Sequence, residues 1–170
     1  MVDYRPEYDA ADGKFLDELA EFRATALPGD KFIRLEPRHV GKSARLLLAA
    51  YESEKAWIVG HNKKWRQYLA EELGVDQVEG NKFKRITSCH AHQTISWNTH
   101  EYDLYVDEFL YLDDAELKKF LDLGWKSITM VSSIPTNEYL TDARKIAEEV
   151  STWPEWKTAG FDLSKLCLAN

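Results

Sequence analysis

Residues 32–43 read FIRLEPRHVGKS, and this stretch contains the features that decide the fold of the chain. The apolar run at 32–35 predicts a buried strand, and residues 43–52 have the apolar spacing of a helix. Residues 36–43 therefore occupy a strand-to-helix junction, where backbone N–H groups and the helix N-terminus can surround a phosphate. The stretch predicts a phosphate-binding P-loop.

Each part of this loop has a predicted role. Gly41 lets the chain turn and approach the ligand closely, Lys42 supplies a point charge to the β- and γ-phosphates, and Ser43 offers a hydroxyl to Mg²⁺. Further nucleotide contacts are expected from the preceding loop residues Pro37, Arg38, His39 and Val40. Glu36 departs from the general motif, which has Gly there, and its carboxylate would repel phosphate unless it points away.

A second motif is YDLYVDE at residues 102–108. It predicts a short apolar strand that ends in two carboxylates, at the edge where open α/β sheets bind their ligands. We expect Asp107 to hold Mg²⁺ and Glu108 to polarise the attacking water as the catalytic carboxylate. The alternative for this pair alone is two surface acids at a strand end. Combined with the loop at 36–43, the pair indicates a P-loop NTPase that binds ATP and Mg²⁺.

A third polar cluster follows the strand predicted at 127–131. The tip of that strand should lie beside the γ-phosphate, so Ser132, Ser133 or Thr136 could sense the phosphate and couple its loss to movement. A simple polar strand end is a comparably good interpretation, and Asn137 is equally a candidate helix cap.

The rest of the chain alternates between strand and helix patterns. Further strands are predicted at 56–59, 83–88 and 104–106, and further helices at 65–73, 115–123 and 139–150, after a first helix that Asp12 would cap. This alternation predicts an α/β fold, a three-layer P-loop NTPase of RecA/ASCE-like type with a mostly parallel central sheet flanked by helices. Residues 1–150 are expected to form the ATPase domain. Residues 151–170 form a tail whose Trp153 and Trp156 dock on the core or bind a partner.

The length, composition and net charge of the chain limit its possible functions. The chain has 170 residues, 44% of them hydrophobic, and a formal net charge of -7, which argues against non-specific nucleic-acid binding over most of the surface. With two cysteines, no signal-like segment and no apolar run long enough for a bilayer, we expect a reducing, intracellular protein without membrane association.

Two local clusters invite other functions. Cations alternate with aromatic residues at Lys63, Lys64 and Arg66 and again at Lys82, Lys84 and Arg85, as in grooves that follow a nucleic-acid strand, although solvated faces are the simpler interpretation. Cys89, His90 and His92, with His100, suggest zinc, but the paired ligand spacing of structural zinc sites is missing.

The runs PRHVGKS, YDLYVDEFL and VSSIPTNEYL resemble, in order and spacing, the Walker A, Walker B and coupling motifs of tailed-phage DNA-packaging ATPases. These include terminase large subunits and the short motors of small phages. The resemblance covers residues 32–140 and implies that Lys42 and Ser43 bind phosphate and Mg²⁺, that Asp107 coordinates the metal, that Glu108 is catalytic, and that Arg38 responds to the nucleotide. It also implies that residues 132–135 form the coupling element, and it makes Glu36 less unusual.

By the same resemblance, we expect ATP hydrolysis coupled to translocation of double-stranded DNA, in a homo-oligomeric ring on a viral portal or capsid, in the cytoplasm of an infected bacterial cell. Packaging enzymes add a second domain for which 170 residues leave no room, so we expect an isolated ATPase domain or a reduced motor. Arg85 and Arg144 are candidates for an arginine that acts on a neighbouring subunit. Alternatives are a nucleoside-kinase-like phosphotransferase and a nucleotide-binding module with little turnover.

Overall fold

The computed structural model describes residues 15–36, 41–60, 63–72, 86–87, 98–133, 151–152 and 154. Five strands form one sheet in the order β1-β5-β4-β2-β3, and each neighbouring pair is parallel. The strands are β1 (Lys31–Glu36), β2 (Ala56–Val59), β3 (Ile86–Thr87), β4 (Asp103–Asp107) and β5 (Ser127–Ser133). The predicted parallel α/β sheet is therefore confirmed.

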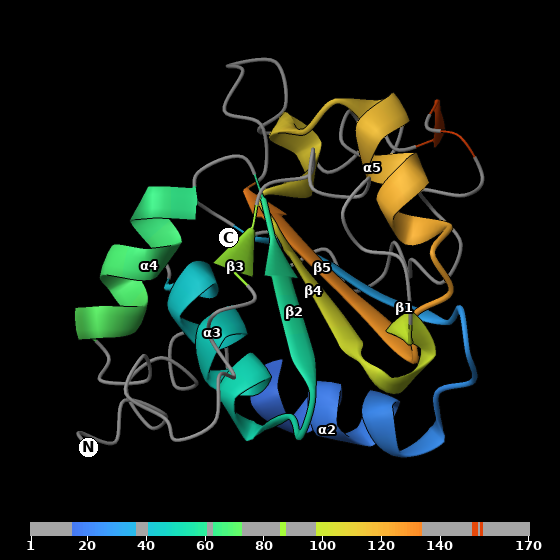
Figure 1. Ribbon diagram of the computed structural model, residues 1–170, viewed down its shortest axis with the longest axis horizontal. Helices are drawn as coiled ribbons and strands as arrows, with labels where there is room; N and C mark the ends of the chain where they lie inside the picture. The colour runs from blue at the N-terminus through green and yellow to red at the C-terminus, as the bar shows by residue number, and fades with distance from the viewer. Residues whose placement is uncertain are drawn as a thin grey trace.

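Helices connect these strands, as parallel pairing requires. They are α2 (Phe15–Thr25), α3 (Lys42–Glu52), α4 (Lys63–Glu72) and α5 (Asp114–Leu121), with short 3₁₀ turns η3 (Thr99–Glu101) and η4 (Phe109–Tyr111). In Figure 1, α2, α3 and α4 lie on one side of the sheet and α5 on the other. The three layers of the prediction are present in the described part of the chain.

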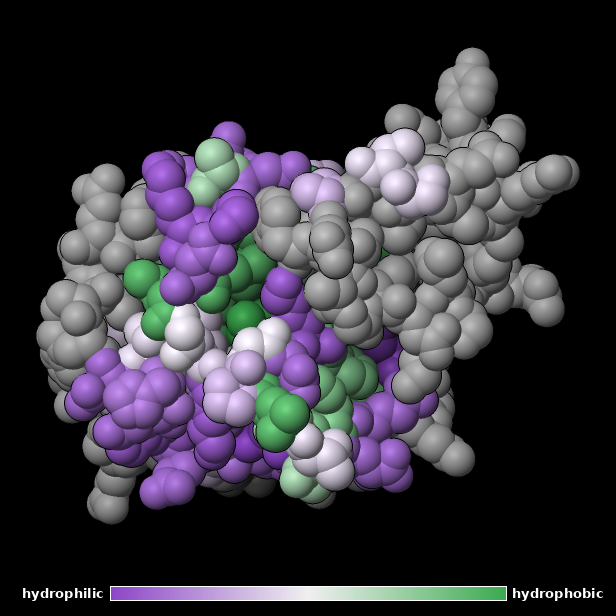
Figure 2. Space-filling model, turned by 90° about the vertical axis from the view of Figure 1, so that its right-hand side faces the viewer, coloured by the Kyte–Doolittle hydropathy of each residue, from purple (hydrophilic) through white to green (hydrophobic). Residues whose placement is uncertain are grey.

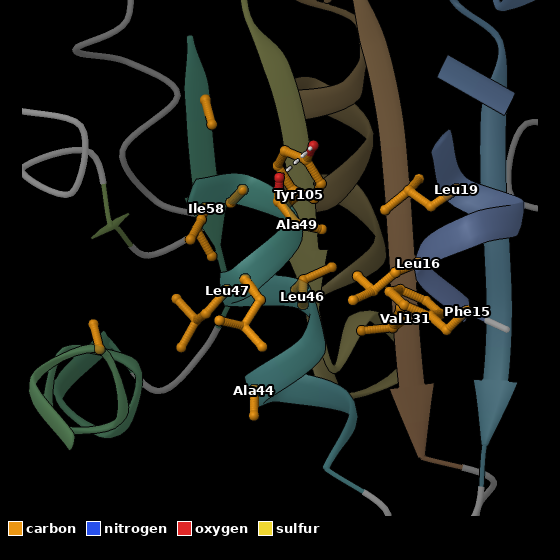
Figure 3. Close-up of a cluster of buried hydrophobic side chains, with 14 residues drawn as sticks. Phe15, Leu16, Leu19, Ala44, Leu46, Leu47, Ala49, Ile58, Tyr105 and Val131 are labelled. Carbon is orange, nitrogen blue, oxygen red and sulfur yellow. Dashed lines mark hydrogen bonds between the residues drawn. The ribbon is translucent and has the colours of Figure 1, made fainter. Parts of the chain in front are cut away.

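Each face of the sheet has its own hydrophobic core. On one face, α2 and α3 contribute Phe15, Leu16, Leu46 and Leu47, which meet sheet residues such as Tyr105 (Figure 3). On the other face, α5 and η4 pack on alternate sheet residues, including Leu104 and Val106. Side chains along a strand point alternately to opposite faces, so β4, with all five residues buried, serves both cores.

Trp125 anchors the second core. Its ring stacks on Phe120 with centroids 5.4 Å apart, and its indole N–H donates to the Phe120 carbonyl at 2.7 Å. The indole thus fills space on the sheet while its one donor is satisfied. Gly124, with φ 76°, provides the left-handed turn that carries the chain from α5 toward β5.

The outer surface is mainly polar. Among the described residues, the large hydrophobic side chains that are exposed are Leu27, Tyr68 and Tyr111, which come from separate elements. Figure 2 shows one side of the molecule, on which hydrophilic residues alternate with small groups of hydrophobic ones. In the described part of the chain, no helix is both long and apolar enough to cross a bilayer.

Several predicted boundaries change. The strand predicted at 127–131 continues to Ser133, so Ser132 and Ser133 belong to β5 and do not follow it. They extend it because they pair with Leu35 and Glu36 of β1. Of the strand predicted at 83–88, residues 86–87 are described as strand, while Asp12, the helix predicted at 139–150 and the tryptophans Trp153 and Trp156 lie outside the described residues.

Candidate functional site

The candidate site lies at the carboxyl edge of the sheet. Here β1 ends at Glu36, β4 ends at Asp107 and β5 ends at Ser133, and α3 begins at Lys42. Because the strands are parallel, their carboxyl ends meet at one edge, and the N-terminus of the helix that follows β1 faces the same edge. The two sequence motifs, more than 60 residues apart, are therefore brought together.

Gly41 starts the helix of the predicted P-loop. Its φ of 77° and ψ of 17° lie in the left-handed region, where glycine is favoured, and its carbonyl accepts the first helical hydrogen bond from the Arg45 N–H at 3.0 Å. The N-cap residue Gly41 has no side chain that could bond to the first backbone N–H groups of the helix, which makes them suited to an anion. Residues 37–40, and with them Pro37, Arg38, His39 and Val40, lie outside the described residues.

Ser43 and Asp107 form the predicted metal pair. The Ser43 hydroxyl lies 3.0 Å from Oδ1 and 3.1 Å from Oδ2 of Asp107, which is 2% exposed. Burial raises the pKa of the Asp107 carboxyl, while the nearby Arg66 guanidinium and the Ser43 hydrogen bond oppose that rise. An alcohol and a carboxylate oxygen this close fit the hard-oxygen ligands that Mg²⁺ takes.

Lys42 and Glu108 form a second pair beside the first. Lys42 Nζ lies 2.7 Å from Glu108 Oε1, and Lys42 is buried although it carries a charge. Glu108 has φ 53° and ψ 48°, a left-handed conformation that is uncommon for a residue with a side chain. Such conformations concentrate at functional sites because the surrounding structure must hold them in place.

Ser132 and Ser133 bind Glu108. The Ser133 N–H and hydroxyl donate to Glu108 Oε2 and Oε1 at 2.8 Å each, and the Ser132 hydroxyl lies 3.2 Å from Oε2. Burial raises the pKa of Glu108, but the bonds from Lys42 and Ser133 outweigh it and hold that pKa below its usual value. The role of these serines beside the γ-phosphate stays a prediction, and in the structure they contact the carboxylate predicted to be catalytic. Thr136 lies outside the described residues.

Glu36 pairs with two arginines. Its carboxylate lies 2.9 Å from Arg34 Nε and pairs on its other oxygen with Arg45 of α3, and all three side chains are buried. Burial raises the pKa of Glu36 to about 7, against the opposing effect of Arg34 and Lys42. Two guanidinium groups therefore compensate the negative charge of this carboxylate. The repulsion between Glu36 and phosphate that the sequence suggested does not follow.

The basic residues proposed for nucleic-acid contact separate into different groups. Lys64 is exposed on α4, but Arg66 is 1% exposed and lies 3.9 Å from Asp107. The prediction that Arg66 binds nucleic acid is therefore wrong for this structure, because its guanidinium faces the sheet. The side chain of Lys63 and the cluster Lys82, Lys84 and Arg85 lie outside the described residues, as does Arg144.

The zinc hypothesis receives no support from the described residues. They contain no group of three or more His, Cys, Asp or Glu side chains placed to hold a metal ion. His100 is exposed in η3, and Cys89, His90 and His92 lie outside the described part.

Sequence reasoning missed the two buried arginines Arg45 and Arg66. Arg45 follows the GKS triplet by two residues, where helical periodicity turns it toward the buried end of β1. The burial of Arg45 could have been predicted from the sequence, because this arginine lies among the apolar residues of the buried stripe of α3. Arg66 was predicted to contact nucleic acid or to lie on a solvated face, because cations alternate there with Trp65 in the sequence, and its burial was not predicted.

Comparison with known proteins adds no relatives. No protein-family model matches the chain. No curated protein matches it either. The functional argument therefore depends on the motifs and on the geometry of the site.

Proposed function

We propose that this chain is a P-loop ATPase of the RecA/ASCE-like class. The observation that carries the proposal is the meeting of Lys42 and Ser43, in the first turn of α3, with Glu108 and Asp107 at the end of β4, through contacts of 2.7 and 3.0 Å. Two separate motifs had predicted these four residues, and their meeting supports a site where Lys42 could bind phosphate and Ser43 and Asp107 could bind a metal.

The strand order supports the same class. β5 lies between β1, which leads into the loop, and β4, which delivers the two carboxylates. Consequently the end of β5 can support Glu108 from one side while the helix N-terminus approaches it from the other. Ser133 and Lys42 occupy those two positions.

Each residue has a proposed role in hydrolysis. Lys42 and the N–H groups of the α3 N-terminus would bind the β- and γ-phosphates. Ser43 and Asp107 would hold Mg²⁺, which supplies positive charge to the phosphate oxygens when it is bound. Glu108 would orient and polarise the attacking water, and its low pKa keeps it ionised at neutral pH. Arg38 is proposed to respond to the nucleotide.

We further propose that hydrolysis drives movement of double-stranded DNA, in a ring of identical subunits that acts with a viral portal or capsid. The support is the resemblance of the three motifs to tailed-phage packaging ATPases. Contacts to DNA phosphates through the basic residues near 63–64 and 82–85 would release counterions, so DNA should stimulate turnover more at low salt than at high salt.

The experiment follows phosphate release from ATP by the wild type and by Lys42→Ala, with and without DNA at two salt concentrations and with a panel of nucleosides. Loss of Lys42 should remove most nucleotide affinity, because its ammonium is the main point charge in the cradle. Unchanged binding of an ATP analogue to Lys42→Ala would refute the P-loop proposal. Transfer of phosphate to a nucleoside would indicate a kinase, and binding without turnover would indicate a nucleotide-binding module.

A further inference from the structure

A buried arginine lies behind the proposed metal pair. Arg66, in the second turn of α4, donates from Nη2 to the carbonyl of Gly60 at 2.9 Å, and Gly60 directly follows β2. Since Val59 of β2 pairs with Val106 of β4, Gly60 lies level with Asp107 across the sheet. The guanidinium is thus held at the carboxyl ends of β2 and β4.

Gly60 makes this close approach possible. A Cβ atom at position 60 would lie 2.4 Å from Arg66 Nη1 and 2.7 Å from the backbone oxygen of Asp107. The Asp107 oxygen is a backbone atom that cannot easily move aside, so glycine at position 60 leaves the space in which the guanidinium lies beside Asp107. The absence of a side chain at position 60 therefore accommodates both Arg66 and the backbone of Asp107.

Charge compensation links the same two residues. Arg66 is 1% exposed and Asp107 2% exposed, and burying either charge without an opposite partner would be costly. Arg66 Nη1 lies 3.9 Å from Asp107 Oδ2, and Ser43 reaches the same carboxylate from α3. The Asp107 carboxylate is consequently contacted from both α3 and α4.

We propose that Arg66 is a positioning residue that orients the Asp107 carboxylate toward Ser43 and so prepares the Mg²⁺ site. The inference rests on the proposed function. Arg66 acts through Asp107 and not on the nucleotide, so its removal should impair metal-dependent binding selectively. This distinguishes it from Lys42, whose loss should weaken nucleotide binding with or without metal.

The test measures binding of a slowly hydrolysed ATP analogue across a Mg²⁺ titration, and separately in EDTA, for the wild type, Arg66→Gln and Arg66→Lys. For Arg66→Gln we expect the half-saturating Mg²⁺ concentration to rise about tenfold or more, while binding in EDTA stays within about twofold, because a buried charge pair has lost one partner. Arg66→Lys should recover part of the loss, since one ammonium keeps the charge but lacks the planar fork that reaches two acceptors.

Glu71→Gln is the matched control, because Glu71 lies on the same helix but is exposed. It should leave both measurements unchanged. Equal weakening of Arg66→Gln in Mg²⁺ and in EDTA would overturn the assignment, as would a wild-type Mg²⁺ dependence in either Arg66 variant. Should Arg66→Gln fail to fold by thermal melting, Arg66→Lys carries the test alone. A wild type that binds no nucleotide would instead refute the proposed function.

Discussion

Replacing Glu108 by Gln tests the site most directly, because four contacts converge on this carboxylate. Oε1 faces Lys42 Nζ at 2.7 Å and the Ser133 hydroxyl at 2.8 Å, while Oε2 accepts from the Ser133 N–H at 2.8 Å and lies 3.2 Å from the Ser132 hydroxyl. Lys42 and the Ser133 N–H can only donate. A carboxylate offers each of them an oxygen.

A glutamine amide cannot do the same. It has one oxygen and one NH₂ group, so its NH₂ must face either the Lys42 ammonium or the Ser133 N–H, and one of these bonds is lost. We expect Lys42 to be released, since the backbone N–H is fixed in β5. A charge-assisted hydrogen bond contributes about 1.5–3 kcal/mol, so ATP, which no longer competes with Glu108 for Lys42, should bind roughly tenfold more tightly or better.

Hydrolysis should change in the opposite direction. Loss of the carboxylate that activates water should slow turnover by about 10²–10⁴-fold, the usual contribution of a general base. Single-turnover hydrolysis and equilibrium binding of Mg²⁺-ATP measure the two effects separately. Glu101→Gln is the control, because Glu101 pairs with Lys55 at the surface and touches none of these residues.

The reasoning would be refuted if Glu108→Gln hydrolysed ATP within about threefold of the wild type, since a general base normally contributes far more. Binding that weakened in Glu108→Gln would also contradict it, because the competition between Glu108 and phosphate for Lys42 would then be absent. The first outcome would assign the catalytic carboxylate elsewhere, and the second would refute the release of Lys42.

Two further predictions concern buried charges away from the reacting groups. The pKa of Glu36 rises from 4.5 in the unfolded chain to about 7 in the folded protein. Between these two pH values the folded protein binds more protons than the unfolded chain. The free energy of unfolding should therefore fall as the pH rises from 4.5 to about 7, by up to about 3 kcal/mol. Urea unfolding between pH 4.5 and 8 should therefore show a steeper decline for the wild type than for Glu36→Gln, and parallel curves would exclude this residue as the source. Asp103 accepts from Ser53 and Ser127 at 2.5 and 2.6 Å and pairs with Arg23 at the opposite edge of the sheet. Asp103→Ala should cost about 2–4 kcal/mol of stability, because it leaves buried donors without an acceptor, while ATP affinity stays unchanged; a melting temperature equal to the wild type would contradict this.

Local patterns predicted most of the secondary structure around the site. An apolar run followed by GKS, and another followed by Asp107 and Glu108, are short-range signals, because strand and helix periodicity is set by neighbouring residues. The structure places the strands and the helix close to their predicted positions. Lys42, Ser43, Asp107 and Glu108 could therefore be selected from the sequence before their contacts were known.

Contacts across the sheet could not be selected in this way. Ser132 and Ser133 follow an apolar run, so the sequence predicted a polar strand end, but it could not show that β5 pairs with β1 as far as Ser133 or that both serines contact Glu108. Arg66 adjoins Lys64 and Trp65 in the sequence, a pattern that suggested a nucleic-acid contact or a solvated face. Its burial depends on the missing Cβ of Gly60, six residues earlier, and on Asp107, which another strand supplies.

The sequence by itself determined which residues are candidates for phosphate and metal binding, because the residue types that such sites need occur in two compact runs. The tertiary structure decided which of their neighbours compensate the charges. Glu36 illustrates the difference: read alone, it is a carboxylate in a phosphate loop, but the fold turns it toward Arg34 and Arg45. Charge compensation depends on distance in space and on burial, and neither is encoded in the local spacing of residues.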